Sequence, residues 1–301
     1  MVSKYRKYAS LIIISLLIFA NVLLLLRINK EGVLSSRQLI SGATFKNSCK
    51  YNIDNRYPLI PYDDKIQEGD RVFMKVSDIS TFIKNPPPVK LTVIVSNSDE
   101  TFDNKLMSSI QPYAVNVYAI NCSAEGAKQL PIGFRDNQYV SHKEYFDVLN
   151  NSSRNKNILC FVNFLISTNT NERQSAMDIF SSKKWATVDN EYKNISIDKS
   201  LKFNDSDVKK KRLQFYSTLK RTKFVVCPPG TGQDTHRIYE TLLFGGIPII
   251  KSSFLDPMYE IMGGCWIVND WNEVTEDECN TRWANKQDTN FEWNDVSFWL
   301  S

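Results

Sequence analysis

The sequence predicts an α/β protein with parallel sheets, because short apolar, β-branched segments alternate with helix-type segments over roughly 200 residues. A polar stretch at 150–157 divides this pattern into two sets, each sufficient for one small sheet. Hydrophobic residues make up 42% of the 301 residues and charged residues 23%, a globular balance that excludes a disordered or fibrous protein. The net charge of only +4, with no basic stripe, argues against a nucleic-acid partner.

The N-terminal segment 9–26 is almost wholly apolar and predicts an uncleaved transmembrane anchor. As a helix it is about 27 Å long, which matches a thin bilayer core. A cleaved signal peptide is the alternative, but the apolar run continues to Arg27, where a cleavage site should lie. We therefore expect a short cytosolic tail at 1–8 and a lumenal or extracellular body.

Residues 27–88 are expected to form a stalk and an irregular lead-in, closed by the stiff proline triplet 86–88. The N-terminal Rossmann-like domain then covers 89–150. Its predicted strands at 91–95 and 115–120 flank a predicted helix at 100–111, which is a β–α–β unit with parallel strands. Asp99 lies in the turn after the first strand, where it can cap this helix.

The C-terminal domain, 151–301, continues the alternation of strands and helices. The predicted strands are 158–162, 185–188, 224–227, 247–250 and 265–268, and the predicted helices are 171–180, 207–221, 235–244 and 254–262. The six cysteines of the chain are widely spaced, without a C-x-x-C pair, so zinc is not expected and the disulfide pairing stays open.

The segment 224–250 carries the chemistry, since it reads as strand, glycine loop, helix, tight turn and strand. Gly230 and Gly232 let the loop backbone approach a ligand closely, and the N–H groups of the first helical turn favour an anion. Arg237 in that turn can add a bidentate charge for a diphosphate. Glu240 lies one turn later on the same face and suits the paired hydroxyls of a ribose.

A purely structural interpretation of this segment stays open. Every strand-to-helix turn needs glycine and a cap, which Thr235 can provide, and Arg237 with Glu240 can form a simple ion pair. The loop matches neither the dinucleotide fingerprint G-x-G-x-x-G nor a Walker loop.

Two stretches nevertheless resemble the exostosin-like (GT47-like) glycosyltransferase family. Residues 227–240, CPPGTGQDTHRIYE, with 244–250, FGGIPII, are similar to its signature block P-x-G-x-G-x-D-x-x-R-x-x-E followed by G-x-I-P-V. Residues 162–173, VNFLISTNTNER, resemble a second segment of that family, N-F-x-x-x-T-N-x-x-x-R. The resemblance covers roughly 130–275.

The resemblance implies a GT-B fold, in which two Rossmann-like domains face a cleft and the C-terminal one holds a nucleotide-sugar donor. It implies a type II membrane protein of the Golgi or endoplasmic reticulum that transfers a sugar to a glycan or glycoprotein hydroxyl, with inversion and without a required metal or cofactor. The donor-binding residues carried over from the motifs are Arg173, Gly230, Thr231, Gly232, Asp234, His236, Arg237 and Glu240.

The catalytic base is not identified by the sequence. Asp99 and Glu100 follow the first predicted strand, at the edge of the sheet where α/β proteins bind ligands, and His142 is a further candidate. A lumenal sulfotransferase and a catalytically inactive, anchored binding protein are the alternative functions. The transferred sugar and the acceptor stay open.

Overall fold

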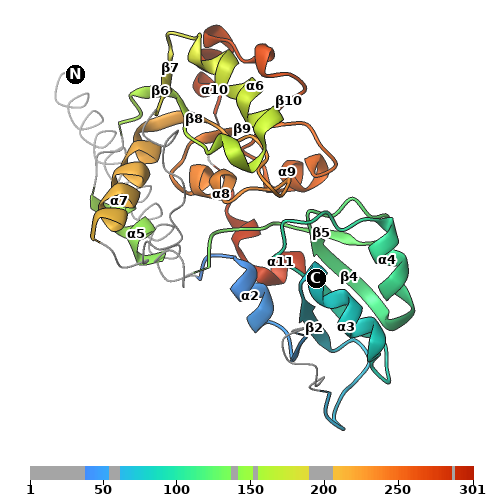
Figure 1. Ribbon diagram of the computed structural model, residues 1–301. Helices are drawn as coiled ribbons and strands as arrows, with labels where there is room; N and C mark the ends of the chain where they lie inside the picture. Colours follow the sequence, from blue (N-terminus) through green and yellow to red (C-terminus); the bar gives the residue numbers. More distant parts are fainter. Residues whose placement is uncertain (1–37, 54–61, 137–141, 152–154, 190–205, 287–288) are drawn as a thin grey trace, which may run out of the picture. The chain divides into compact units, whose positions relative to one another are not determined.

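Two five-stranded parallel sheets organise the part of the chain that the structure describes (Figure 1). The computed structural model describes residues 38–53, 62–136, 142–151, 155–189, 206–286 and 289–301. Within it, Leu39–Ser301 form one compact unit. The α/β class with two parallel sheets is thus confirmed, an arrangement consistent with a GT-B-like fold.

The first sheet has its strands in sequence order. They are β1 (Tyr51–Asn52), β2 (Arg71–Met74), β3 (Leu91–Val95), β4 (Ala114–Ile120) and β5 (Lys128–Leu130), all parallel. Helices α2 (Gly42–Asn47), α3 (Ile79–Lys84) and α4 (Asn104–Ile110) belong to this half. Strand β3 is mostly apolar because it is buried on both faces: Ile94 packs in one core cluster, and Leu91, Val93 and Val95 pack in another.

The second sheet has the order β10-β9-β8-β6-β7 and is also entirely parallel. Its strands are β6 (Ile158–Val162), β7 (Ala186–Val188), β8 (Thr222–Val226), β9 (Ile247–Lys251) and β10 (Trp266–Val268). The helices of this half are α5 (His142–Asn151), α6 (Thr170–Ser181), α7 (Ser206–Arg221), α8 (His236–Leu243), α9 (Asp256–Met262) and α10 (Glu276–Ala284).

The strand order of the second sheet reverses beside β6. The chain leaves β6 for β7 on one side and then returns to β8 on the other side. Val162 and Val226, the last residues of β6 and β8, are register partners, so both strands end side by side. In open α/β sheets ligands bind outside the carboxyl ends of the strands at such a reversal. The fold therefore points to the residues that follow Val162 and Val226.

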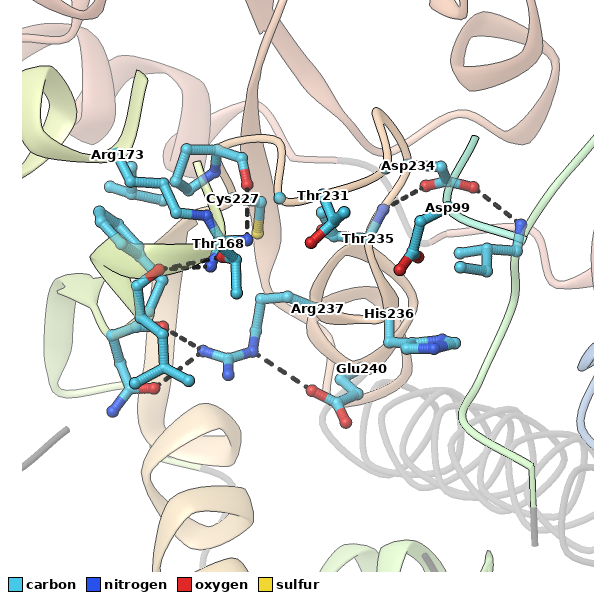
Figure 2. Close-up of a pocket in the computed structure, with 18 of the residues that line it drawn as sticks. Asp99, Thr168, Arg173, Cys227, Thr231, Asp234, Thr235, His236, Arg237 and Glu240 are labelled. Atoms are coloured by element: carbon cyan, nitrogen blue, oxygen red, sulfur yellow. Dashed lines mark hydrogen bonds and ion pairs between the residues drawn. The ribbon is translucent and has the colours of Figure 1, made fainter. Parts of the chain in front are cut away.

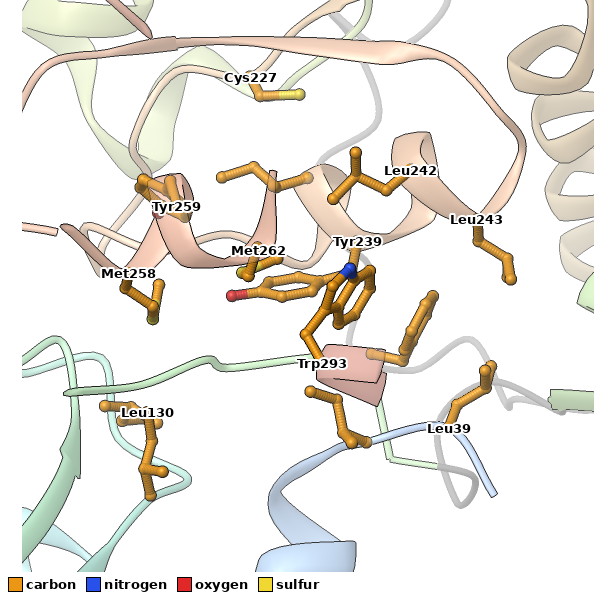
Figure 3. Packing of buried hydrophobic residues seen from close by; sticks show 14 of the residues in the cluster. Leu39, Leu130, Cys227, Tyr239, Leu242, Leu243, Met258, Tyr259, Met262 and Trp293 are labelled. Atoms are coloured by element: carbon orange, nitrogen blue, oxygen red, sulfur yellow. The ribbon is translucent and has the colours of Figure 1, made fainter. Parts of the chain in front are cut away.

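The C-terminal segment returns to the first sheet through α11 (Val296–Trp299). Lys128 Nζ, on β5, donates to the carbonyl of Ser301 at 2.9 Å. Trp293 is buried in a core cluster that contains residues of both halves, among them Leu130 on β5 and Tyr239 on α8 (Figure 3). This shared core explains why the described chain from Leu39 onward forms one compact unit.

The structure differs from the sequence-based boundaries at three places. The expected lead-in 27–88 contains β1 and β2 of the first sheet and helices α2 and α3. These strands have two and four residues, too few for a clear alternation of apolar and polar positions. Helix α4 begins at Asn104, with Asp103 as its N-cap instead of Asp99. Residues 142–150, expected in the first domain, form most of helix α5, which packs against α7 of the second half.

No helix in the described part of the chain has the length and apolar character needed to cross a bilayer. The anchor expected at 9–26 lies outside the described residues.

Candidate functional site

A cavity of about 230 Å³ lies at the carboxyl ends of β6 and β8, where the strand order reverses (Figure 2). Its walls come from the turn after β6, the glycine loop after β8, the first turns of α8, and two segments that follow strands of the first sheet. The residues used below are Asp99, Ile132, Arg135, Asn163, Arg173, Gly230, Thr231, Gly232, Asp234, Thr235, His236, Arg237 and Glu240, all of which line it.

The N-terminus of helix α8 opens into this cavity without a side-chain cap. Thr235 stands at the N-cap position in extended conformation, yet its hydroxyl makes no capping bond. The Thr235 Oγ1 atom is buried and has no hydrogen-bond partner among the residues that the structure describes. The backbone N–H groups of His236 and Arg237 have no acceptor within the helix, because they belong to its first turn. Such a helix end presents donors and a partial positive charge to an anion.

The Arg237 side chain is fixed in the wall of the cavity by three groups. Nη1 donates to the Asn163 carbonyl at 2.6 Å and to Asn163 Oδ1 at 3.2 Å, while Nε pairs with Glu240 Oε2 at 3.3 Å. The guanidinium carbon lies 4.1 Å from the ring centroid of Phe215. The pairing expected from the structural interpretation, Arg237 with Glu240, therefore exists. It leaves the Nη2 group of Arg237 without a partner among the described residues.

Glu240 is a buried carboxylate that already accepts two hydrogen bonds. Besides the Arg237 contact, its Oε1 accepts from the hydroxyl of Tyr145 at 3.1 Å. A carboxylate offers about four lone-pair sites, so two stay available to a ligand. The structure thus brings both Arg237 and Glu240 to the cavity wall.

Arg173 donates its hydrogen bonds to backbone carbonyls of the protein. Its guanidinium donates to the carbonyls of Pro229 at 2.8 Å, Leu165 at 2.8 Å and Pro228 at 3.3 Å. Burial, together with the nearby positive charge of Arg237, lowers the pKa of this guanidinium to about 10. Its clearest role is to hold the loop after β8 against the turn after β6.

The two loop glycines are needed for packing within the protein. A Cβ atom on Gly230 would lie 2.8 Å from Arg173 Nη2, and one on Gly232 would lie 2.9 Å from Asn121 Nδ2. The close approach that glycine permits is therefore to neighbouring protein groups. Thr231, at the tip between them, is exposed.

Asp234 faces inward and anchors the loop. Its carboxylate accepts from the N–H groups of Ile132 and Thr235, both at 2.8 Å, and from the hydroxyls of Tyr239 and Tyr259. Burial raises the pKa of Asp234 to about 6 against the opposing effect of these donors. Its own backbone N–H donates to Asn121 Oδ1 at 2.8 Å. The loop is thus tied to residues that follow β4 and β5 of the first sheet.

Of the two histidines and Asp99, only His236 and Asp99 line the cavity. His236 lines the cavity, and its Nδ1 lies 2.8 Å from the Gly133 carbonyl. Asp99 lines the cavity from the first-sheet half and is exposed. His142 does not line this cavity; its Nε2 lies 2.7 Å from the Arg135 carbonyl.

Sequence reasoning missed three residues of the site. Asn121 and Asn163 follow β4 and β6 directly, and their position at the carboxyl ends of predicted strands was the available signal. Asn121 adopts a left-handed conformation, φ 47°, and is fully buried. Arg135 is exposed, and no element predicted from the sequence contained it.

No group of three or more His, Cys, Asp or Glu side chains in the described residues lies close enough together to hold a metal ion. The six cysteines are free thiols.

Comparison with known protein families adds one finding. Residues 139–275 match the family model described as RXYLT1 C-terminal domain, which belongs to the exostosin-like glycosyltransferase group. The matched range, a little under half of the chain, includes α8, the glycine loop and the turn after β6. No match was found among the curated proteins. The match supports a glycosyltransferase.

Proposed function

We propose that this protein transfers a sugar from a nucleotide-sugar donor to a hydroxyl of a glycan or glycoprotein, and that the donor diphosphate binds at the N-terminus of α8. The observation that carries this proposal is the uncapped helix end with a buried, unpartnered hydroxyl, Thr235 Oγ1. An unsatisfied buried polar group costs about 1–3 kcal/mol, so a ligand that accepts its hydrogen bond is favoured.

The positive end of α8 and Arg237 would stabilise the leaving diphosphate. Negative charge grows on that group as the bond from the anomeric carbon to the diphosphate oxygen breaks. The N–H groups of His236 and Arg237 point along the helix axis, and Arg237, whose Nη2 has no partner in the described ranges, adds a fixed positive charge. Because Asn163 and Glu240 already hold the guanidinium, little reorganisation is needed when the charge develops.

Glu240 would bind the donor ribose. Its carboxylate is oriented by Tyr145 and Arg237 and keeps lone pairs available. Neutral sugar hydroxyls are good donors to such a group.

We further infer that the transfer inverts the anomeric centre and proceeds without a metal. A single displacement needs only a stabilised leaving group and a base for the acceptor hydroxyl. Arg237 and the positive end of α8 supply the positive charge that a metal ion would otherwise bring to the leaving diphosphate. Retained activity in EDTA and a product of inverted configuration, seen by NMR, are the expected results.

Anchoring by 9–26 in a Golgi or endoplasmic-reticulum membrane, with a lumenal catalytic body, is part of the same proposal. The length and apolar character of that segment support it. Membrane association of the full chain that disappears on deletion of 1–27 would agree; association that survives the deletion would not.

The activity test uses the purified protein with a panel of nucleotide sugars, and a sulfonated nucleotide in parallel. Thr235→Val removes the hydroxyl while keeping the shape of the side chain, and Thr235→Ser is the matched control. We expect nucleoside diphosphate affinity to fall roughly 10-fold or more in Thr235→Val, as for the loss of a charge-assisted hydrogen bond, and to stay near wild type in Thr235→Ser.

Three results would contradict the proposal. Turnover of the sulfonated nucleotide would indicate a sulfotransferase. Donor binding without turnover would indicate a binding protein. Equal nucleotide affinities of the two Thr235 variants would show that the N-terminus of α8 does not bind the diphosphate.

A further inference from the structure

One imidazole nitrogen in the cavity has no partner in the described part of the chain. His236 is the first residue of α8, and its ring extends on the side of the helix away from the Arg237 side chain (Figure 2). Its Nδ1 lies 2.8 Å from the carbonyl of Gly133. A carbonyl oxygen only accepts, so Nδ1 carries the proton and donates. In the neutral ring, Nε2 then carries a lone pair.

The carbonyl that fixes this tautomer is itself held rigidly. Gly133 has φ 69°, a conformation that suits glycine, and an added Cβ would lie 2.4 Å from the Ile40 carbonyl. The neighbouring Phe134 N–H donates to that same Ile40 carbonyl at 2.8 Å. The imidazole therefore rests on a backbone segment that has little freedom to move. Histidines that work in proton transfer are oriented in this way through their second nitrogen.

The surroundings of His236 keep its ring neutral. Burial is the main cause that lowers the pKa of His236, and the positive charge of Arg135 lowers it too. The Gly133 carbonyl and the more distant carboxylates of Glu240 and Asp136 act in the opposite direction. The N-terminus of α8 adds positive potential at the same point. At neutral pH, Nε2 is thus an acceptor and cannot donate to a phosphate oxygen.

His236 lies on the side of the cavity where we place the sugar acceptor, away from the Arg237 side chain proposed to bind the donor (Figure 2). Arg237, Asn163 and Glu240 form the part of the wall attached to the second sheet. His236 bonds to Gly133, between Ile132 and Arg135, which line the cavity together with Asp99 from the first-sheet half. A nitrogen lone pair can take the proton of a sugar hydroxyl, whereas it repels the lone pairs of a phosphate anion.

We propose that His236 Nε2 is the proton acceptor for the attacking hydroxyl of the sugar acceptor, an inference that rests on the glycosyltransferase function proposed above. The hydroxyl oxygen forms a bond to the anomeric carbon of the donor, and its proton moves to Nε2. The bond from the anomeric carbon to the diphosphate oxygen breaks, and its electron pair leaves with the diphosphate. The charge that the ring gains is shared with the Gly133 carbonyl through Nδ1–H.

Two substitutions separate proton acceptance from a structural role. In His236→Asn the amide nitrogen can take the place of Nδ1 and keep the bond to Gly133, but nothing replaces Nε2. In His236→Gln the amide takes the place of Nε2 and the bond to Gly133 is lost. His142→Asn removes the only other imidazole of the chain. The measurements are kcat/KM for the acceptor against pH and nucleoside diphosphate affinity by calorimetry.

We expect both His236 variants to lose about 10²- to 10⁴-fold in kcat/KM, the usual contribution of general base catalysis, with diphosphate affinity within twofold of wild type. In the wild type, kcat/KM rises with pH as Nε2 loses its proton and then levels off. This acid limb should disappear in His236→Asn and persist in His142→Asn.

Activity retained in His236→Asn but lost in His236→Gln would overturn the inference and leave His236 as a support of the loop. Diphosphate affinity that falls in His236→Asn would overturn it in favour of a phosphate contact. A wild-type protein that neither binds nor turns over any nucleotide sugar would instead refute the proposed function itself, and the inference with it.

Discussion

Replacing Arg237 with glutamine tests the proposed donor site and the packing around it at the same time. The substitution removes two hydrogen bonds to Asn163, at 2.6 and 3.2 Å, the 3.3 Å pair with Glu240, and the stacking on Phe215. Glu240 keeps only its bond from Tyr145 and becomes a buried carboxylate without a counter-charge.

The expected loss of folding stability is roughly 2–3 kcal/mol. Breaking a fully buried pair costs about 3–5 kcal/mol, and the 21% exposure of the Arg237 side chain reduces that figure. The loss of a charge-assisted contact to the ligand should weaken nucleoside diphosphate binding by a further 1.5–3 kcal/mol, about 10- to 150-fold.

Arg212→Gln is the matched control. Arg212 on α7 forms a two-point pair with Glu144 on α5, at 3.0 and 3.1 Å, and its side chain is 14% exposed. Neither residue lines the cavity. Urea unfolding should show a similar loss of stability in both variants, whereas calorimetry should show weaker nucleotide binding in Arg237→Gln alone. A folded Arg237→Gln variant that binds the nucleotide like wild type would refute the reasoning.

Two further substitutions test the loop between β8 and α8. Gly232→Ala places a Cβ 2.9 Å from Asn121 Nδ2 and 3.3 Å from the Asp99 carbonyl, so we expect a loss of about 1–3 kcal/mol in unfolding free energy; unchanged stability would show that the neighbours give way freely. Asp234→Asn should change the pH dependence of stability, since the pKa of Asp234 is raised to about 6 in the folded protein. Between about pH 4 and 6 the folded state binds more protons than the unfolded state, so the wild type loses up to about 3 kcal/mol relative to Asp234→Asn as the pH rises through this range. A difference in unfolding free energy that does not vary between pH 4.5 and 7 would contradict the buried carboxylate.

The sequence predicted the parts of the fold that have strong local patterns. Strands β3, β6, β8 and β9 each contain a run of mostly apolar residues, because both of their faces are buried. Strands β1 and β2 escaped prediction because they are short and depend on pairing, β1 with β2 and β2 with β3. Pairing between distant segments leaves no periodic mark in a sequence.

In the candidate site, too, the sequence predicted the local relations and missed the contacts between distant segments. Arg237 and Glu240 lie on one helix, so their spacing alone places them together, and the structure brings both to the cavity. Their partners could not be inferred: Asn163 and Tyr145 come from other elements, and the three carbonyls that hold Arg173 belong to the backbone. Likewise, the bond between His236 and Gly133 joins residues 103 positions apart.

The central claim is that the uncapped N-terminus of α8 holds the diphosphate of a nucleotide sugar. A crystal structure of the protein with a bound nucleoside diphosphate tests it most directly. We expect phosphate oxygens within hydrogen-bond distance of Thr235 Oγ1 and the backbone N–H groups of His236 and Arg237, with the ribose beside Glu240. A nucleotide bound elsewhere on the chain, with the Thr235 hydroxyl still unpartnered, would contradict the claim.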